Sequence, residues 1–520
     1  MTRGWRFFLP SIAGSLFLGL FLTLSLFTGR ALLRDADTGY HIRAGDFILE
    51  TFSVPREDIF SFLSPPPPWT AHEWLSEIIM ALVHKVSGLT GLVIFFSFVI
   101  AIVYYLQFKA LRRLKTNIVL DLLIILLVVA ASQLHWLARP HIFSLLIFVI
   151  WYYLLDRYQY EDKNYLYVLP PIMLLWVNLH GGFIVGFILV GIYLIGNLVE
   201  MIISQGTQRQ GWKEKSVALS VTIVACLFVS LINPYGYDIL LFPFRLISDK
   251  FIMDSVLEFK SPNFHEFMPF RYLLFLTIAI LAVSKTRLNI IELLLLLLFT
   301  HMALYSARYI TIFAIIAAPI LVKQAESILS TISGSMSDSF KKRANNIAVI
   351  DASARGNIWP IAGVVATCIF AANGTIGYQF DEGKKPVAAV EFVKREDLKG
   401  NMFNNDEFGD YMIYAAWPKY KVFIDGRSDM YGAGRIKEYF KVARMQPGWE
   451  KVIEKYNINW ILYNADSPLS AFLAERKDWR LIYADKVATI FVKHISANQP
   501  LINKFPNVKL VVDEEPRESK

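Results

Sequence analysis

The sequence has few charged residues and almost no cysteine. Only 18% of its 520 residues are charged and 55% are hydrophobic, whereas about a quarter of a soluble globular chain is charged. This balance excludes intrinsic disorder, a collagen-like chain and a coiled coil, and indicates that lipid surrounds much of the protein. The two cysteines, Cys226 and Cys368, lie inside apolar runs, so neither a disulfide framework nor a thiolate metal site is expected.

Nucleotide and zinc-protease motifs are also missing. The chain contains no P-loop, no dinucleotide glycine fingerprint and no H-E-x-x-H. An ATP-driven pump and a zinc protease are therefore unsupported, and we expect no nucleic-acid partner.

Long apolar runs predict about 11 membrane-spanning helices. They lie near 7–29, 89–108, 117–134, 141–155, 164–178, 181–203, 216–232, 272–284, 289–304, 308–322 and 357–377. The first follows Arg3 and Arg6, is long and has no A-x-A-like cleavage site after it. We therefore expect an uncleaved anchor rather than a signal peptide.

Basic residues are concentrated in alternate connections between these spans. Those after spans two, six, eight and ten contain Lys109, Arg112, Arg113, Lys115, Arg209, Lys213, Lys215, Lys285, Arg287, Lys341, Lys342 and Arg343. The positive-inside rule then predicts a cytoplasmic N-terminus, with residues 30–88 and 233–271 as outside loops. We expect a multi-pass protein of the bacterial inner membrane whose C-terminal segment is periplasmic or extracellular.

The predicted organisation is a transmembrane domain at 1–377, which includes both outside loops, and an extracytoplasmic α/β domain at 378–520. In the second domain, short apolar runs alternate with amphipathic stretches, which predicts a mixed sheet with helices. The apolar runs are Val422–Ile424, Trp460–Tyr463 and Thr489–Val492, and the amphipathic stretches are Arg435–Ala443, Trp449–Tyr456 and Leu469–Glu475. Asp513–Lys520 reads as a frayed tail, and loop 233–271 is expected to carry interfacial helices at 239–246 and 251–257.

The first outside loop holds the residues best suited to chemistry. Asp35 and Asp37 directly follow the first span, and the loop continues with His41, Arg43, His72, Glu73 and Glu77. Two carboxylates beside His and Arg can hold a base whose pKa is tuned by its neighbours. An acidic loop that only obeys topology is the alternative. The carboxylates could also bind a divalent metal ion, but the spacing requires none.

Polar residues also recur at the outside ends of the helices. They lie in three turns and include His135, Arg139, His141, Asn178, His180, His301, Tyr305 and Arg308. Because charged groups are costly at membrane depth, they could converge on a cavity for an anionic head group such as a phosphate. Interfacial snorkelling is the alternative. Asp425 and Arg427 follow a predicted strand, where open α/β sheets often bind ligands, although they could simply pair within a turn.

Four segments resemble those of uncharacterised bacterial members of the GT-C superfamily of integral-membrane glycosyltransferases. They are Asp35–Gly45, His72–Glu77, Asn178–Gly182 and Val422–Arg427, and the resemblance covers essentially the whole chain. It implies a GT-C-like fold and transfer of a sugar from a polyprenyl-phosphate-linked donor to a protein, glycan or lipid acceptor on the outer face. No cofactor is required for this chemistry.

The resemblance also implies roles for individual residues. Asp37 would act as general base or orient the acceptor, with Asp35 as second choice, although the pair here reads Asp-Ala-Asp rather than an adjacent acidic pair. The donor phosphate would be bound by Arg139, His141, His180 and Arg308. Acceptor-binding or supporting roles fall to His41, Arg43, His72, Glu73, Glu77, Asn178, Asp425 and Arg427.

Two other classes of function are compatible with this architecture. A non-catalytic GT-C-like scaffold or complex subunit would bind a protein partner through its outside domain, and changes around Asp425–Tyr431 would then break the complex. A transporter or flippase for a polyprenyl-linked sugar would be expected to show paired broken helices in its two halves, and no such repeat is visible in the sequence.

Overall fold

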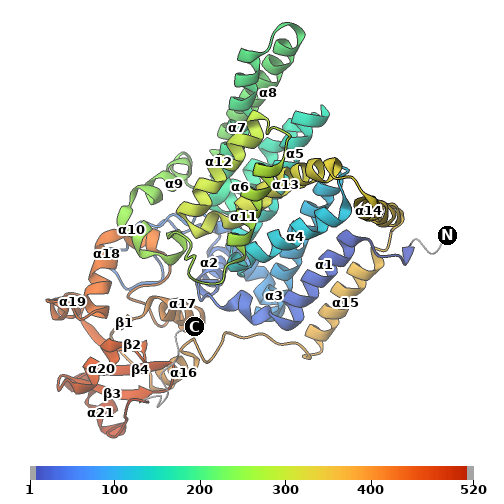
Figure 1. The fold of residues 1–520 in the computed structure, drawn as a ribbon. Helices are drawn as coiled ribbons and strands as arrows, with labels where there is room; N and C mark the ends of the chain where they lie inside the picture. Colours follow the sequence, from blue (N-terminus) through green and yellow to red (C-terminus); the bar gives the residue numbers. More distant parts are fainter. Residues whose placement is uncertain (1–6, 512–520) are drawn as a thin grey trace. The chain divides into compact units, whose positions relative to one another are not determined.

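The computed structural model describes residues 7–511, which fold into two compact units (Figure 1). Unit 1 contains the chain up to Leu32 and Thr90–Gly377, whereas unit 2 joins Leu33–Leu89 to the segment that begins at Tyr378. The first outside loop therefore folds with the C-terminal segment, although the sequence analysis had grouped it with the spans. The basic flank Arg3 and Arg6 and the tail Asp513–Lys520 lie outside the described residues.

Unit 1 is a bundle of mostly apolar helices, with polar residues along α14 and the first half of α8 (Figure 1). They are α1 (Ile12–Leu22), α3 (Trp74–Arg112, which begins in unit 2 and breaks at Ser87–Gly88), α4 (Ile118–Ser132), α5 (His141–Glu161), α6 (Leu169–Leu179), α7 (Ile184–Ile203), α8 (Gly206–Ser230), α11 (Pro269–Val283), α12 (Ile290–Tyr305), α13 (Ile310–Thr331), α14 (Ser335–Ser353) and α15 (Ile358–Ala372). Two amphipathic helices, α9 (Asp238–Ser248) and α10 (Lys250–Ser255), lie in the predicted interfacial loop.

Each of the eleven predicted spans contains a helix. Within residues 7–511, five helices are long and apolar enough to cross a membrane, or six if the bent pair α14–α15 counts as one span. Four shorter apolar helices and α8 account for the other predicted spans. The chain is a polytopic membrane protein with a smaller C-terminal α/β region.

The connections of unit 1 gather at two ends of the bundle. At one end, Lys215 bonds to the Gln159 carbonyl across 2.7 Å, and the Asn117 amide donates to Glu326 across 2.8 Å. At the other end, His135 donates to the Ala307 carbonyl across 2.6 Å. The first two bonds join connections that were predicted to lie inside, and the third joins two that were predicted to lie outside.

Unit 2 is built around a four-stranded sheet in the order β1-β2-β4-β3. The strands are β1 (Asn401–Asn404), β2 (Ile458–Asn464), β3 (Trp479–Ala484) and β4 (Ala488–Lys493). β1 and β2 are parallel and the other pairs antiparallel, so the predicted mixed sheet is confirmed. β2 is buried along most of its length, which explains its nearly continuous apolar sequence.

Helices surround this sheet in unit 2. They are α2 (Thr38–Thr51), α16 (Val387–Glu396), α17 (Asp406–Ala416), α18 (Ser428–Ala443), α19 (Trp449–Lys455), α20 (Pro468–Glu475) and α21 (Gln499–Lys504). Helix α2 packs closely on α17, because Gly39 has no side chain and a β-carbon there would lie 2.8 Å from the Asp410 carbonyl oxygen. The amphipathic stretches predicted near 435, 449 and 469 are all helical.

The strand predicted at Val422–Ile424 is wrong. Val422 forms only an isolated bridge with Ser61, and the Asn404 side chain takes the place of a neighbouring strand. Its Oδ1 accepts the Phe423 amide across 2.8 Å, and its Nδ2 donates to the Ile424 carbonyl across 2.7 Å. This backbone is therefore paired without belonging to the sheet.

Candidate functional site

Asp35 and Asp37 lie in the turn that leads into α2. Both are half-buried, and Asp35 Oδ1 accepts the Asp37 amide across 3.0 Å, which is the local bond by which Asp shapes a turn. Asp37 is the residue before the first turn of α2, and its carbonyl accepts the His41 amide across 3.2 Å. The Asp37 backbone is therefore fixed on both sides.

The Asp37 carboxylate packs against Gly426, a residue from the far end of the chain. A β-carbon at Gly426 would collide with Asp37 Oδ1 and lie 3.2 Å from Asp410 Oδ2. The Gly426 amide donates to Asp410 Oδ1 across 3.0 Å. The carboxyl groups of Asp37 and Asp410, which come from distant segments, therefore both lie against the exposed Gly426. A larger residue at 426 would displace them.

Asp410 is fully buried in α17. Burial raises its pKa well above the ordinary value, and the nearby carboxylates of Asp37 and Asp425 raise it further. Because neighbouring carboxyls cannot readily both ionise, the more deeply buried one keeps its proton. The buried Asp410 carboxyl therefore favours its protonated form, and the half-buried Asp37 carboxyl lies beside it.

Asp425 and Arg427 form a buried ion cluster with a residue that the sequence analysis missed. Arg427 Nη2 lies 2.7 Å from Asp425 Oδ2 and 2.8 Å from Asp58 Oδ1. The rings of Phe60 and Trp69 stack on the guanidinium at 4.8 and 4.5 Å. Burial raises the pKa of Asp58, but Arg427 and hydrogen bonds from Ser61 and Phe60 outweigh it and hold that pKa below its usual value. The cluster is 2% exposed at Arg427, so it supports the fold beneath the site.

His41 lies at the centre of a second polar group in unit 2. Its Nδ1 is 3.1 Å from Glu77 Oε1, and its Nε2 is 3.6 Å from Glu73 Oε2. His72 Nε2 approaches the other Glu73 oxygen at 3.7 Å. His41 and Glu77 are buried, whereas His72 and Glu73 are half-buried, so only the outer pair is open to an acceptor.

Arg43 has a structural role. Its Nε and Nη2 donate to the Tyr414 carbonyl across 2.8 and 2.6 Å, and its Nη1 bonds to Asp46 across 3.1 Å. These bonds fix α2 to the end of α17.

In unit 1, the outside turns bring several predicted cations around Glu258. Arg139 Nη1 bonds to Glu258 Oε1 across 3.0 Å, and Arg308 lies over the neighbouring Phe259 ring at 5.2 Å. Arg139 lowers the pKa of Glu258 to about 2 against the opposing effect of burial, and Arg308, His141 and His135 lower it further. The two arginines among the four residues predicted to bind phosphate, Arg139 and Arg308, thus already act on one carboxylate.

His180 lies beside this group. Its ring centroid is 6.5 Å from that of His141, and its Nδ1 accepts the Gly182 amide across 2.9 Å. Ser144 Oγ lies 2.8 Å from the same nitrogen and accepts the Trp176 Nε1–H across 2.7 Å. These bonds fix the orientation of the His180 ring in the turn between α6 and α7.

Asn178 bridges two connections of the bundle. It donates to the Ile232 carbonyl across 3.1 Å and accepts from Asn233 Nδ2 across 3.0 Å. Its amide is used in packing, so the structure gives it a supporting position.

The part of the chain that the structure describes contains no assembled set of metal ligands. Within residues 7–511, no three His, Cys, Asp or Glu side chains come close enough together to hold an ion. The carboxylates of the first outside loop divide between the Asp37 turn and the His41 group, so they do not form one such set.

Together, the helical bundle and the α/β unit define a polytopic membrane protein of the GT-C fold type. The solved structures to which the chain is similar include two crystal structures of ArnT, a GT-C glycosyltransferase, from Cupriavidus metallidurans. The structure bound to undecaprenyl phosphate matches with a TM-score of 0.52 at 11% identity, covering 93% of this chain and 98% of that chain. The apo structure gives 0.50 at 12%, covering 92% and 97%.

No family model and no curated protein sequence matches the chain. At such low identity the structural likeness establishes the fold, and it confirms the GT-C-like architecture that the sequence resemblance implied. The roles of individual residues stay predictions.

Proposed function

We propose that this protein is a membrane glycosyltransferase that moves a sugar from a polyprenyl-phosphate-linked donor to an acceptor on the outer face of the inner membrane. The observation that carries the proposal is the half-buried Asp37 carboxylate, fixed beside Gly426 and the buried Asp410, in a chain with the ArnT fold. The N-terminus would be cytoplasmic and the C-terminal region periplasmic or extracellular.

Asp37 is the proposed general base. An acceptor hydroxyl is a poor nucleophile, and a carboxylate can take its proton as the new bond to the anomeric carbon forms. The bond between that carbon and the lipid phosphate breaks in the same step. The raised pKa of the buried Asp410 supports this role, because a protonated carboxyl beside Asp37 repels a second negative charge less than an ionised one does.

The cations around Glu258 are the proposed site for the donor phosphate. Negative charge builds up on the phosphate as it leaves, and Arg139 and Arg308 can stabilise that charge with directed hydrogen bonds. His141 and His180 offer further ring nitrogens nearby. The ArnT crystal structure with undecaprenyl phosphate supports a lipid phosphate as ligand for this fold.

The alternative of a non-catalytic scaffold is less well supported. It assigned partner binding to the segment Asp425–Tyr431, but Asp425, Arg427 and Tyr431 are only 2%, 2% and 8% exposed. These three side chains do not offer a docking surface, which leaves only the exposed Gly426 and the half-buried Ser428–Met430 to contact a partner.

The test compares Asp37→Asn with Glu50→Gln, a matched charge removal at an exposed position on α2, the helix that follows Asp37. The full-length proteins are reconstituted in liposomes with undecaprenyl-phosphate-linked radiolabelled sugars and membrane acceptors, and undecaprenyl phosphate binding is measured by native mass spectrometry. We expect Asp37→Asn to reduce transfer by about 100-fold or more while binding is unchanged, and Glu50→Gln to behave as wild type.

Two results would contradict the proposal in different ways. Full transfer by Asp37→Asn would remove this residue from the mechanism. If the wild-type protein neither bound undecaprenyl phosphate nor transferred any of the sugars, the proposed function itself would be wrong.

A further inference from the structure

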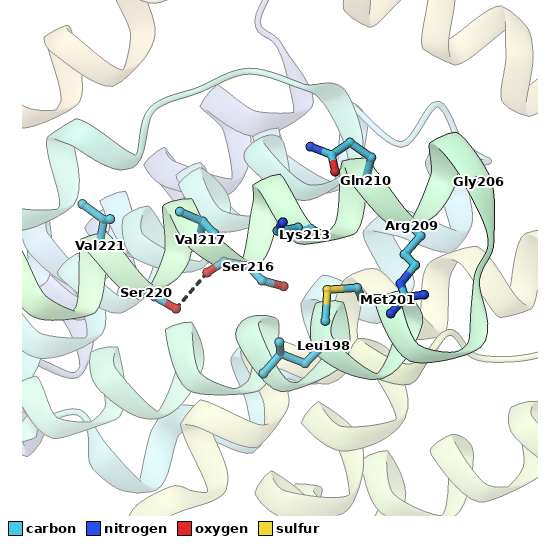
Figure 2. A pocket seen from close by; sticks show the side chains of 10 residues that line it. All are labelled: Leu198, Met201, Gly206, Arg209, Gln210, Lys213, Ser216, Val217, Ser220 and Val221. Atoms are coloured by element: carbon cyan, nitrogen blue, oxygen red, sulfur yellow. Dashed lines mark hydrogen bonds between the residues drawn. The ribbon is translucent and has the colours of Figure 1, made fainter.

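The hairpin of α7 and α8 contains a cavity that none of the predicted site residues lines. Its volume is about 650 Å³, and it opens between the two helices near their connecting turn (Figure 2). The lining residues are Leu198, Met201, Gly206, Arg209, Gln210, Lys213, Ser216, Val217, Ser220 and Val221. It lies at the end of unit 1 that carries the predicted inside connections, away from the Glu258 group.

The lining changes in character along α8. Arg209, Gln210 and Lys213 lie near the turn, and Val217 and Val221 lie further along the helix. From Gly206 to Val221 the helix rises about 22 Å, which is comparable to one leaflet including its head groups. The cavity therefore has a cationic end and an apolar end, spaced as the head group and acyl chain of a lipid would require.

Arg209 and Lys213 have no carboxylate partner within residues 7–511, whereas the neighbouring Lys215 pairs with Asp162 at 3.2 Å. The acidic residue nearest in sequence, Glu214, accepts a hydrogen bond from Gln210 across 2.9 Å. In Figure 2 the Arg209 side chain extends into the space between the helices, beside Met201. Two cations are thus available to an anion that reaches the cavity.

The apolar surface around the cavity is suited to lipid. Ile202, Val217, Val221 and Phe228 are 74%, 56%, 62% and 69% exposed. Such side chains on a membrane-spanning hairpin face acyl chains rather than water. An occupant would therefore have a negative head and an apolar tail.

We propose that this cavity binds an anionic phospholipid of the bilayer, whose phosphodiester is held by Arg209 and Lys213 and whose acyl chain lies along Val217 and Val221. Basic pockets between spanning helices bind such head groups in the cytoplasmic leaflet, which is the side that the positive-inside rule assigns to this turn. The proposal does not depend on the proposed sugar transfer, because the cavity shares no residue with the candidate site.

The test measures binding of phosphatidylglycerol to the full-length protein by native mass spectrometry, with phosphatidylcholine as the neutral probe. Arg209→Gln and Lys213→Gln are each expected to weaken phosphatidylglycerol binding about 5-fold, with a larger loss when they are combined. Phosphatidylcholine binding should not change. The matched control is Lys285→Gln with Arg287→Gln, which removes the same charge from exposed positions on another turn at the same end.

A second variant fills the cavity without changing charge. Ser220→Trp is expected to weaken phosphatidylglycerol binding as well, with the unfolding temperature measured in parallel to confirm that the protein is folded. An equal loss in the Lys285/Arg287 control would show non-specific surface attraction and overturn the proposal. It would also be overturned if undecaprenyl phosphate displaced phosphatidylglycerol completely at equal concentration, or if an acidic peptide bound the cavity in preference to any lipid.

Discussion

Arg427 and Asp58 form a buried ion pair between two distant segments of unit 2. Arg427 Nη2 lies 2.8 Å from Asp58 Oδ1, and the two side chains are 2% and 0% exposed. Arg427 also donates from Nε and Nη2 to the two carboxylate oxygens of Asp425, across 2.8 and 2.7 Å. Charges removed from water destabilise a fold unless all of them stay paired, so this group requires the first outside loop and the C-terminal segment to fold together.

Removing the guanidinium should therefore destabilise the protein strongly. Arg427→Ala leaves Asp58 and Asp425 buried without their cation, which costs about 3–5 kcal/mol and should lower the unfolding temperature in detergent by several degrees. The control is Lys394→Ala, which breaks an exposed pair with Glu391 and should cost less than about 1 kcal/mol. Similar unfolding temperatures for the two variants would show that the buried cluster is not needed for stability.

The raised pKa of Asp410 predicts how stability depends on pH. In the unfolded chain this carboxyl ionises near its ordinary value of 3.8, but in the folded protein it keeps its proton to a much higher pH. The folded state then binds more protons, so its stability falls as pH rises above about 4, until the folded pKa is reached.

Asp410→Asn should remove this dependence, because the amide cannot ionise while its Oδ1 can still accept the Gly426 amide. Between pH 4 and 8, the unfolding temperature of the variant should therefore rise relative to that of the wild type as pH increases. The exposed substitution Asp466→Asn serves as the comparison. A constant difference between Asp410→Asn and wild type across this range would mean that Asp410 is ionised in the folded protein.

Gly426 is predicted to control the position of Asp37. A methyl group at this residue would meet Asp37 Oδ1 and approach Asp410 Oδ2, so Gly426→Ala should move the proposed base. We expect transfer to fall about 10- to 100-fold, with undecaprenyl phosphate binding retained. Gly434→Ala, where a β-carbon would meet no atom within 4 Å, should leave transfer unchanged. If both variants transferred at the wild-type rate, the contact between Gly426 and Asp37 would have no catalytic role.

Hydropathy was sufficient to predict the spans, because each needs a long apolar run whatever its neighbours are. Alternating apolar and amphipathic segments similarly predicted β2, β4 and the helices near 435, 449 and 469. The strand expected at Val422–Ile424 failed for a reason that is not local. Its hydrogen-bond partner is the Asn404 side chain, and such a substitute for a strand leaves no pattern in the sequence.

The missing members of the candidate site are also long-range partners. Asp410 comes shortly after Asp406 and Glu407, which are the acidic residues usual in the first turn of a helix. These neighbours therefore gave no reason to single out Asp410. It lies on the same buried face as Ile413, and a carboxylate on an apolar stripe was the one available signal. No sequence signal pointed to Glu258, because the residues that lower its pKa, Arg139, Arg308 and His141, lie in other turns.

Glu258 should compete with the donor phosphate for the same cations. Its carboxylate bonds to Arg139 and has a pKa of about 2, so it carries a full negative charge between pH 4 and 8. An arriving phosphate must then displace this carboxylate or bind beside it, and like charges in contact cost on the order of several kcal/mol. Glu258→Gln keeps the size of the side chain and removes that repulsion.

We therefore expect Glu258→Gln to bind undecaprenyl phosphate about tenfold more tightly or better, with no change in this gain between pH 5 and 8. Asp238→Asn provides the control, because it removes a carboxylate from an exposed ion pair with Arg245 in the same loop and should leave affinity unchanged. Titration of each variant in detergent, followed by native mass spectrometry, measures the difference. Weaker binding by Glu258→Gln would contradict this prediction, because removing a competitor cannot lower the affinity for the phosphate. It would mean that the Glu258 carboxylate instead positions Arg139 for the phosphate.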